Sequence, residues 1–185
     1  MKRVSLALAI LLVFTLPSAA FAGDGAQLRR ANFAVGYHLN NFRYDFGYGL
    51  NVTSPYFFND RVAVRLSVNT MYFEGIPAGR TEMEWMPYTV YKLGLIGAST
   101  VVNDLFRLYS EGGFLYIVPN SRFSGKTSCG GYGHFGFEFF MDKNAPSCFF
   151  IELGSVGSGI KAEKIAGKPY YAAGFAVAAG FRYHF

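Results

Sequence analysis

Four basic and three acidic residues stand in segments that are otherwise strongly apolar. They are Arg65, Lys92, Arg107 and Arg182 on the basic side and Glu111, Glu138 and Glu152 on the acidic side. Each alternates with apolar or aromatic neighbours, so in extended strands all seven side chains fall on the face opposite to the apolar one. An unpaired buried charge is strongly destabilising. We therefore predict that these seven side chains form a network of ion pairs inside the fold.

Histidines and cysteines are the other residues able to do chemistry. His38, His134 and His184 fall on different predicted strands and at different heights, so we expect no shared metal site and no cofactor. Exported proteins often pair their cysteines. Cys129 and Cys148, however, stand at opposite ends of the predicted strands, roughly 30–40 Å apart by strand rise, and a disulfide needs Cα atoms within about 7 Å. We expect two free thiols.

Alternation of apolar with small or polar residues recurs along the chain and predicts β-strands. The last segment is the clearest, since Phe175 and Phe181 stand on one face while Gly174 and Gly180 stand on the other. Eight segments follow this pattern. They cover residues 33–40, 44–53, 61–74, 91–95, 106–116, 133–141, 148–154 and 171–185.

The connections between these segments are of two lengths. Short breaks rich in Asn and Asp, which suit tight turns, stand at 58–60, 102–104 and 142–147, and longer connections run near 75–84, 119–128 and 158–168. Short turns on one side and long loops on the other are typical of bacterial outer-membrane barrels. We predict an all-β fold, an eight-stranded antiparallel up-and-down transmembrane β-barrel, with its short turns in the periplasm.

The N-terminus has the features of a secretory signal peptide. Lys2 and Arg3 precede an apolar run from Val4 to Leu16, and Ala20 and Ala22 fit a cleavage site. The run is shorter than the roughly 20 residues of a transmembrane helix, which argues against the alternative of an uncleaved anchor. We predict a signal peptide over residues 1–22 and a barrel domain over residues 23–185.

Composition agrees with a membrane environment. The chain is 51% hydrophobic and 16% charged, against roughly 25% charged residues in an average soluble domain. After the signal peptide no second long apolar run follows, and only helices or closed barrels satisfy their backbone polar groups in lipid. The net charge of +5 is modest, and we expect no nucleic-acid partner. These features predict a location in the outer membrane.

At this point the sequence resembles the small eight-stranded outer-membrane β-barrels, such as the transmembrane domain of OmpA, OmpX and the OmpW-like proteins. The resemblance rests on the signal peptide, the eight amphipathic segments and the terminal strand with Phe181, Tyr183 and Phe185. It implies that these three aromatic residues form the signal read by the barrel-assembly machinery. It also implies a single-chain barrel, which we expect to be monomeric, in contact with outer-membrane lipid and lipopolysaccharide.

Aromatic residues gather at the ends of the predicted strands, where their rings favour the membrane interface. Two belts are predicted. The periplasmic belt contains Tyr56, Phe57, Phe106, Phe149, Tyr183 and Phe185, and the outer belt contains Tyr72, Trp85, Tyr116, Tyr132 and Tyr171.

An eight-stranded barrel is just wide enough for side chains to fill its interior. We therefore predict a non-enzymatic barrel with a closed, charge-paired lumen, which serves envelope integrity or surface contact through its loops. The alternative is a narrow channel for small solutes. A second alternative is an enzyme that modifies lipid A. Lipid A deacylases share this barrel shape and use a His-x-Ser pair, but the nearest match is His134-Phe135-Gly136, and glycine has no nucleophile.

Basic residues also gather in the long loops. Arg122, Lys126, Lys161, Lys164 and Lys168 have the charge to bind the phosphates of lipopolysaccharide. The alternative is that these loops are ordinary solvated surface, with their charge offset by nearby glutamates.

Overall fold

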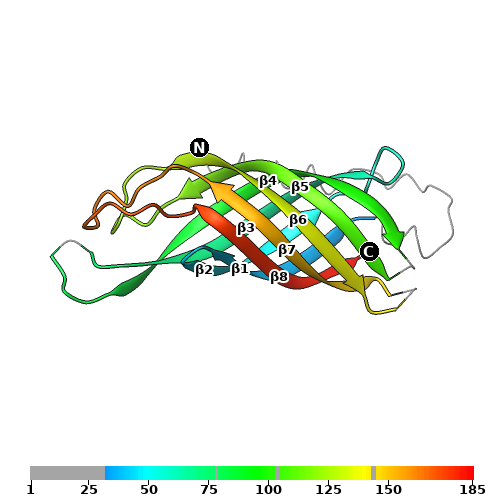
Figure 1. Ribbon diagram of the computed structural model, residues 1–185, viewed down its shortest axis with the longest axis horizontal. Coiled ribbons are helices and arrows are strands. Elements are labelled where there is room, and N and C mark those ends of the chain that lie inside the picture. The colour runs from blue at the N-terminus through cyan, green and yellow to red at the C-terminus, as the bar shows by residue number, and fades with distance from the viewer. Residues whose placement is uncertain (1–31, 78, 103–104, 143–144) are drawn as a thin grey trace, which may run out of the picture.

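The computed structural model describes residues 32–77, 79–102, 105–142 and 145–185. Eight β-strands form one closed antiparallel barrel in which each strand pairs with its neighbours in the chain and β8 pairs with β1 (Figure 1). The strands are β1 (Ala34–Phe42), β2 (Asp45–Thr53), β3 (Val62–Gly75), β4 (Glu84–Val102), β5 (Phe106–Val118), β6 (Ser128–Phe140), β7 (Ser147–Gly157) and β8 (Gly174–His184). Among the described residues, no helix is long and apolar enough to cross a membrane. The predicted fold class is confirmed, while the predicted signal peptide lies outside the described residues.

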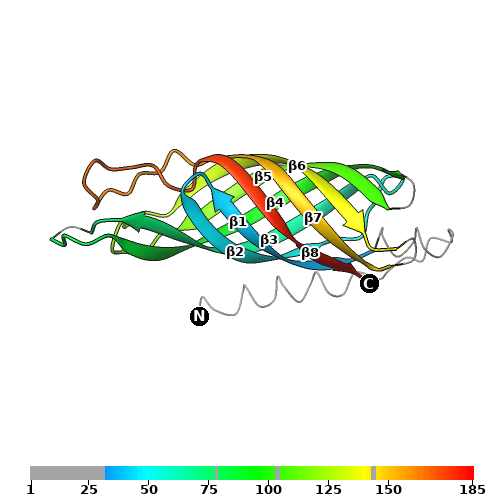
Figure 2. The same cartoon turned by 60° about the horizontal axis from the view of Figure 1, so that its bottom comes forward.

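The last strand closes the barrel onto the first. β8 lies beside β1 (Figure 2), and the register runs without interruption from Ala34 opposite His184 to Phe42 opposite Ala176. Beyond the ladder, the Phe185 amide donates to the Phe33 carbonyl at 2.9 Å, and the two rings lie 5.8 Å apart. The closure leaves no free strand edge, which is the condition for a sheet to stand in lipid.

Strict alternation separates an apolar exterior from a polar interior. On β2, for example, Phe46, Tyr48 and Leu50 are exposed, whereas Asp45 and Asn51 are buried. The same pattern holds in the membrane-facing parts of the other strands. A polar lumen with apolar side chains outside is the inverse of a soluble barrel and the arrangement of a transmembrane one.

Three of the residues predicted for the aromatic belts are buried, so their assignment was wrong. Tyr132 shares the inward face of β6 with His134, and its hydroxyl donates to Glu111 at 2.6 Å. Tyr56 follows the end of β2, where strand alternation no longer applies, and its ring lies under Arg107. Tyr171 is 1% exposed and packs against Phe73 of β3, Tyr88 of β4 and Phe123.

The last strand begins later than the alternation predicted, at Gly174 instead of Tyr171. Ala172 has a φ of 48° and Gly174 a φ of 109°, both in the left-handed region. Such a backbone departs from the extended conformation and breaks the alternation of side chains. Residues 158–173 therefore form one long connection that turns Tyr171 inward.

The long connections and the short turns lie at opposite ends of the barrel (Figure 1). One turn differs from the prediction, because β1 and β2 are joined at the loop end by a tight hairpin, Arg43 and Tyr44. Arg43 has a φ of 59° there. This end of the barrel thus carries three long connections, 76–83, 119–127 and 158–173, and one short one. We call it the outer end and the opposite end the periplasmic end, in keeping with the predicted orientation.

An apolar cluster closes the lumen at this end. Phe73, Tyr88, Phe123 and Tyr171 contact one another, with ring centroids 4.9–6.0 Å apart. Met71, Met86, Ile160 and Ile165 belong to the same buried cluster. Burial raises the pKa of Tyr171, so its phenol stays neutral among these side chains. We call the segment 158–173, which covers the lumen here, the lid.

A carboxylate at the barrel mouth holds the lid. Asp45 lies at the start of β2 and is buried. It accepts one hydrogen bond from the Tyr88 hydroxyl at 2.6 Å and another from the Ala172 amide at 2.9 Å. Both partners belong to the outer end, so one side chain ties the lid to the barrel wall.

Both cysteines are free thiols, as predicted. Cys129 is exposed near the outer end of β6, and Cys148 is buried near the periplasmic end of β7.

Removing the Asp45 carboxylate is expected to release the lid. Asp45→Ala leaves the buried Tyr88 hydroxyl and the Ala172 amide without their acceptor, at a cost of about 1–3 kcal/mol. Trypsin should then cleave after Lys161 or Lys164 faster than in the unchanged protein, as followed by mass spectrometry of the folded barrel. Asp60→Ala, in the turn at the opposite end, is the matched control. Equal cleavage rates in the two variants would contradict the proposed tie.

The lumen as candidate functional site

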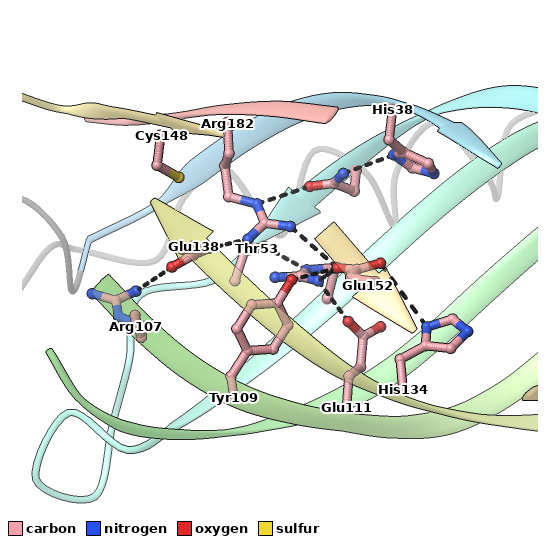
Figure 3. A network of polar contacts seen from close by, with 12 residues as sticks. His38, Thr53, Arg107, Tyr109, Glu111, His134, Glu138, Cys148, Glu152 and Arg182 are labelled. Carbon is pink, nitrogen blue, oxygen red and sulfur yellow. Dashed lines mark hydrogen bonds and ion pairs between the residues drawn. The ribbon is translucent and has the colours of Figure 1, made fainter. Parts of the chain in front are cut away.

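Charged side chains from β3, β5, β6, β7 and β8 meet in the middle of the lumen (Figure 3). Arg65 Nη1 lies 2.6 Å from Glu111 Oε2 and 2.7 Å from Glu152 Oε1, and Arg65 Nε donates to the Thr53 hydroxyl at 3.0 Å. The Tyr109 hydroxyl also donates to Glu152 Oε1, at 2.5 Å. Each of these side chains is nearly inaccessible to solvent.

A second group of ion pairs lies nearer the periplasmic end. Glu138 accepts from Arg182 and, through its other oxygen, from Arg107 at 3.1 Å. Arg182 Nη2 also reaches Glu152 at 3.5 Å, which joins the two groups. Of the seven residues predicted to pair, six therefore belong to one connected network in the described structure.

Lys92 is the seventh, and its main neighbour is a ring. Its Nζ lies 4.6 Å from the centroid of the Tyr132 ring, a distance typical of cation–π contact. Tyr132 in turn donates to Glu111. Lys92 thus contacts the network through Tyr132, which the sequence analysis predicted for the outer aromatic belt.

A neutral polar layer stands between the ion pairs and the lid. His38 bonds Asn69 at 2.7 Å through Nε2 and Asn51 at 2.9 Å through Nδ1. Asn51 also accepts from Arg182 Nε at 3.4 Å. Asn40 donates to Asn69 at 2.8 Å. This layer is made of polar residues of β1, β2 and β3, and it contacts the ion pairs through Arg182.

The segment compared with lipid A deacylases faces the lumen. His134 is 5% exposed, and its Nδ1 lies 3.9 Å from Glu152. Gly136, at the nucleophile position of that pattern, lies directly under the Tyr109 ring, so that a Cβ there would collide with the ring. The His134 imidazole therefore points away from lipid, and Gly136 offers no hydroxyl.

The basic loop residues differ in how far they are already engaged. Arg122 pairs with Glu84, and Lys126 pairs with Glu163 at 3.1 Å. Lys164 Nζ donates to the Ser121 carbonyl at 2.6 Å. Lys161 Nζ lies 4.8 Å from the Tyr170 ring centroid, and within the described part of the chain neither Lys161 nor Lys168 has a carboxylate within ion-pair distance.

The aromatic residues of the last strand lie on the exterior. Phe181 packs on Phe149 with centroids 5.6 Å apart, and Tyr183 packs on Phe185 at 5.1 Å. All of them are exposed, so they form an outward-facing aromatic row at the periplasmic end.

Sequence reasoning missed several members of the site. Tyr109, Thr53, Asn51 and Asn69 lie on the inward faces that strand alternation predicts, but alternation does not identify them as partners of the charged residues. It also missed a group of three potential metal ligands, Glu138, Cys148 and His184, whose ligand atoms lie within 4.8 Å of one another. The sequence carries no signal for this group, because only the register of β6, β7 and β8 brings the three residues together.

Comparison with known proteins gives a likeness of fold. No family model and no curated protein matches the chain. Among solved structures, the N-terminal β-barrel domain of Pseudomonas aeruginosa OprF matches with a TM-score of 0.55 and 14% identity, over 84% of this chain and 98% of that one. Ail of Yersinia pestis, solved with the heparin analogue sucrose octasulfate, matches at a TM-score of 0.44 and 14% identity, over 83% of this chain and 96% of that one.

The chain has the fold of the small outer-membrane β-barrels. The resemblance seen in the sequence is therefore confirmed at the level of fold. The apolar exterior and the polar lumen agree with a barrel that stands in a lipid bilayer.

Neutralising Glu152 is expected to destabilise the barrel strongly. Glu152→Gln leaves Arg65 and Arg182 with one carboxylate fewer in a buried site, and breaking such a pair typically costs about 3–5 kcal/mol. Urea unfolding of the barrel in lipid vesicles, followed by tryptophan fluorescence, measures this loss.

Glu163→Gln is the matched control for that measurement. It removes the partner of Lys126 at an exposed site, where an ion pair contributes at most about 1 kcal/mol. If the two variants unfolded at the same urea concentration, the lumen pairs would not be a source of stability.

Proposed function

We propose that this protein is a non-enzymatic, non-conducting outer-membrane barrel that supports the envelope and makes surface contacts through its loops. The observation that carries the proposal is the filling of the lumen. Ion pairs occupy its middle, a neutral polar layer lies above them, and the apolar cluster under the lid closes the outer end. A solute would have to displace all three layers to pass.

The same observation disfavours the alternative of a solute channel. A conducting pore needs a continuous polar path, yet Phe73, Phe123 and Tyr171 interrupt the lumen with neutral rings. It also disfavours lipid A chemistry, because the only histidine near the deacylase pattern points into this filled lumen.

Conductance distinguishes a filled lumen from a pore. In planar bilayers the unchanged protein should show no stable open channels. A variant with Arg65, Glu111, Glu152 and Arg182 replaced by serine, so that basic and acidic charges leave in equal number, together with Phe123→Ala and Tyr171→Ala, loses side chains that fill the lumen and should conduct ions. Stable channels of the unchanged protein would overturn the proposal.

The surface contact we propose is with phosphate groups of lipopolysaccharide. Three of the five basic loop residues already bond within the loops, which leaves Lys161 and Lys168, both on the lid, with charge to offer. A cavity of about 290 Å³ lies beside Lys161 and is also lined by Ser124, Thr127 and Ser128 and by the ion pair of Lys126 with Glu163. Its hydroxyl groups can donate to phosphate oxygens.

Charge removal on the lid tests this contact. Lys161→Gln with Lys168→Gln should weaken binding of lipopolysaccharide to the barrel in detergent micelles by about thirtyfold, since each of two charge-assisted bonds contributes on the order of 1 kcal/mol. Dephosphorylated lipopolysaccharide should bind both proteins alike. Lys126→Gln, which removes a charge already paired, is the control, and an equal loss in that variant would contradict the assignment to the lid.

A further inference from the structure

We infer that Cys148 and His184 form a binding site for a soft monovalent metal ion, Cu(I), near the periplasmic end of the lumen, with Glu138 as a third, weaker ligand. Cys148 is the second residue of β7 and His184 the last residue of β8, so the site lies within one or two residues of the strand ends. Glu138 belongs to the ion-pair network, whereas Cys148 and His184 contact each other.

The register of three strands brings the ligands together. Cys148 lies opposite Arg182 on β8 and opposite Phe140 on β6. His184 and Glu138 are each two residues from those partners and on the same inward face, which makes both of them diagonal neighbours of Cys148. Figure 3 shows Cys148 and Glu138 facing into the lumen from adjacent strands.

The spacing of the two main ligand atoms fits one metal ion. Cys148 Sγ lies 3.7 Å from His184 Nε2. Ligands bonded to one ion at about 2.0–2.3 Å are about 3.5 Å apart in tetrahedral geometry and about 4.3 Å apart in linear geometry. The observed distance falls between these limits, and the Glu138 oxygen is within 4.8 Å of both atoms.

The imidazole of His184 has no other use for its ring nitrogens. It is 1% exposed, its Nε2 faces only the weakly polar thiol, and its Nδ1 has no hydrogen-bond partner among the described residues. Buried polar groups nearly always have a partner. A metal ion on Nε2 would replace this weak contact with a strong bond, while Nδ1 stays without a partner among the described residues.

The surrounding charges select a monovalent ion. Arg107 and Arg182 both pair with Glu138, so two cations already border the site. Binding of Cu(I) forms a bond to sulfur as the thiol proton leaves for solvent, and the net charge of the lumen is unchanged. A divalent ion would add one positive charge beside two arginines, which a buried site disfavours. Thiolate and imidazole are also ligands that suit Cu(I).

The test uses the full barrel folded in detergent micelles, with the exposed Cys129 replaced by serine so that one thiol remains. Titration with Ag(I), which has the same charge and thiol preference, and with Cu(I) kept reduced by ascorbate should each show one bound ion. Cys148→Ser should abolish binding. His184→Phe should weaken it more than about tenfold, since even residues that only orient a ligand contribute that much to metal affinity.

His134→Phe is the control, because His134 is also buried in the lumen but lies six residues along β6 from the partner of Cys148, roughly 20 Å away by strand rise. X-ray absorption at the copper edge of the Cys129→Ser protein, which needs no ligand variant to fold, should show both sulfur and nitrogen neighbours. Unchanged affinity in His184→Phe, a copper spectrum with sulfur alone, absence of binding, or equally tight binding of Zn(II) would each overturn the proposal.

Discussion

Closure of the sheet is the constraint on which the rest of this structure depends. In lipid every backbone amide and carbonyl must find its partner within the protein, and this chain meets the requirement by pairing β8 with β1 along their whole common length. Eight strands fix a narrow interior. Whatever faces inward must then pack against the opposite wall, which is why polar side chains here form layers instead of lining a water-filled path.

Charge compensation follows from that narrowness. Four basic and three acidic side chains share a space from which water is largely excluded, so each cation needs a carboxylate or a ring beside it. Arg65 and Arg182 share Glu152, Arg107 and Arg182 share Glu138, and Lys92 lies over Tyr132. The network gives stability only as a unit, because removing one carboxylate leaves two arginines undercompensated.

Different kinds of side chain close the two ends of the lumen. At the outer end the lid brings in apolar rings from loops and is fixed by the Asp45 carboxylate. At the periplasmic end, Tyr56 and Phe140 lie against Arg107, and Cys148 and His184 stand beside Glu138. The outer closure combines side chains of β3 and β4 with side chains of the long connections, whereas the periplasmic one comes mainly from strand ends.

Alternation in the sequence determined the eight strands, their up-and-down order and the inward direction of all seven charged residues, because a side-chain period of two is a local property of extended backbone. Local pattern failed where the backbone leaves that conformation, as at Ala172 and Gly174, which turn Tyr171 from the predicted outer belt into the apolar cluster. It could not say which charges meet, since the register between strands and the curvature of the closed wall decide that Arg65 reaches Glu152 while Lys92 meets a ring. The sequence by itself thus established a membrane barrel with a charged interior, and the tertiary structure decided how that interior is filled, because filling depends on distances across the barrel that no local pattern contains.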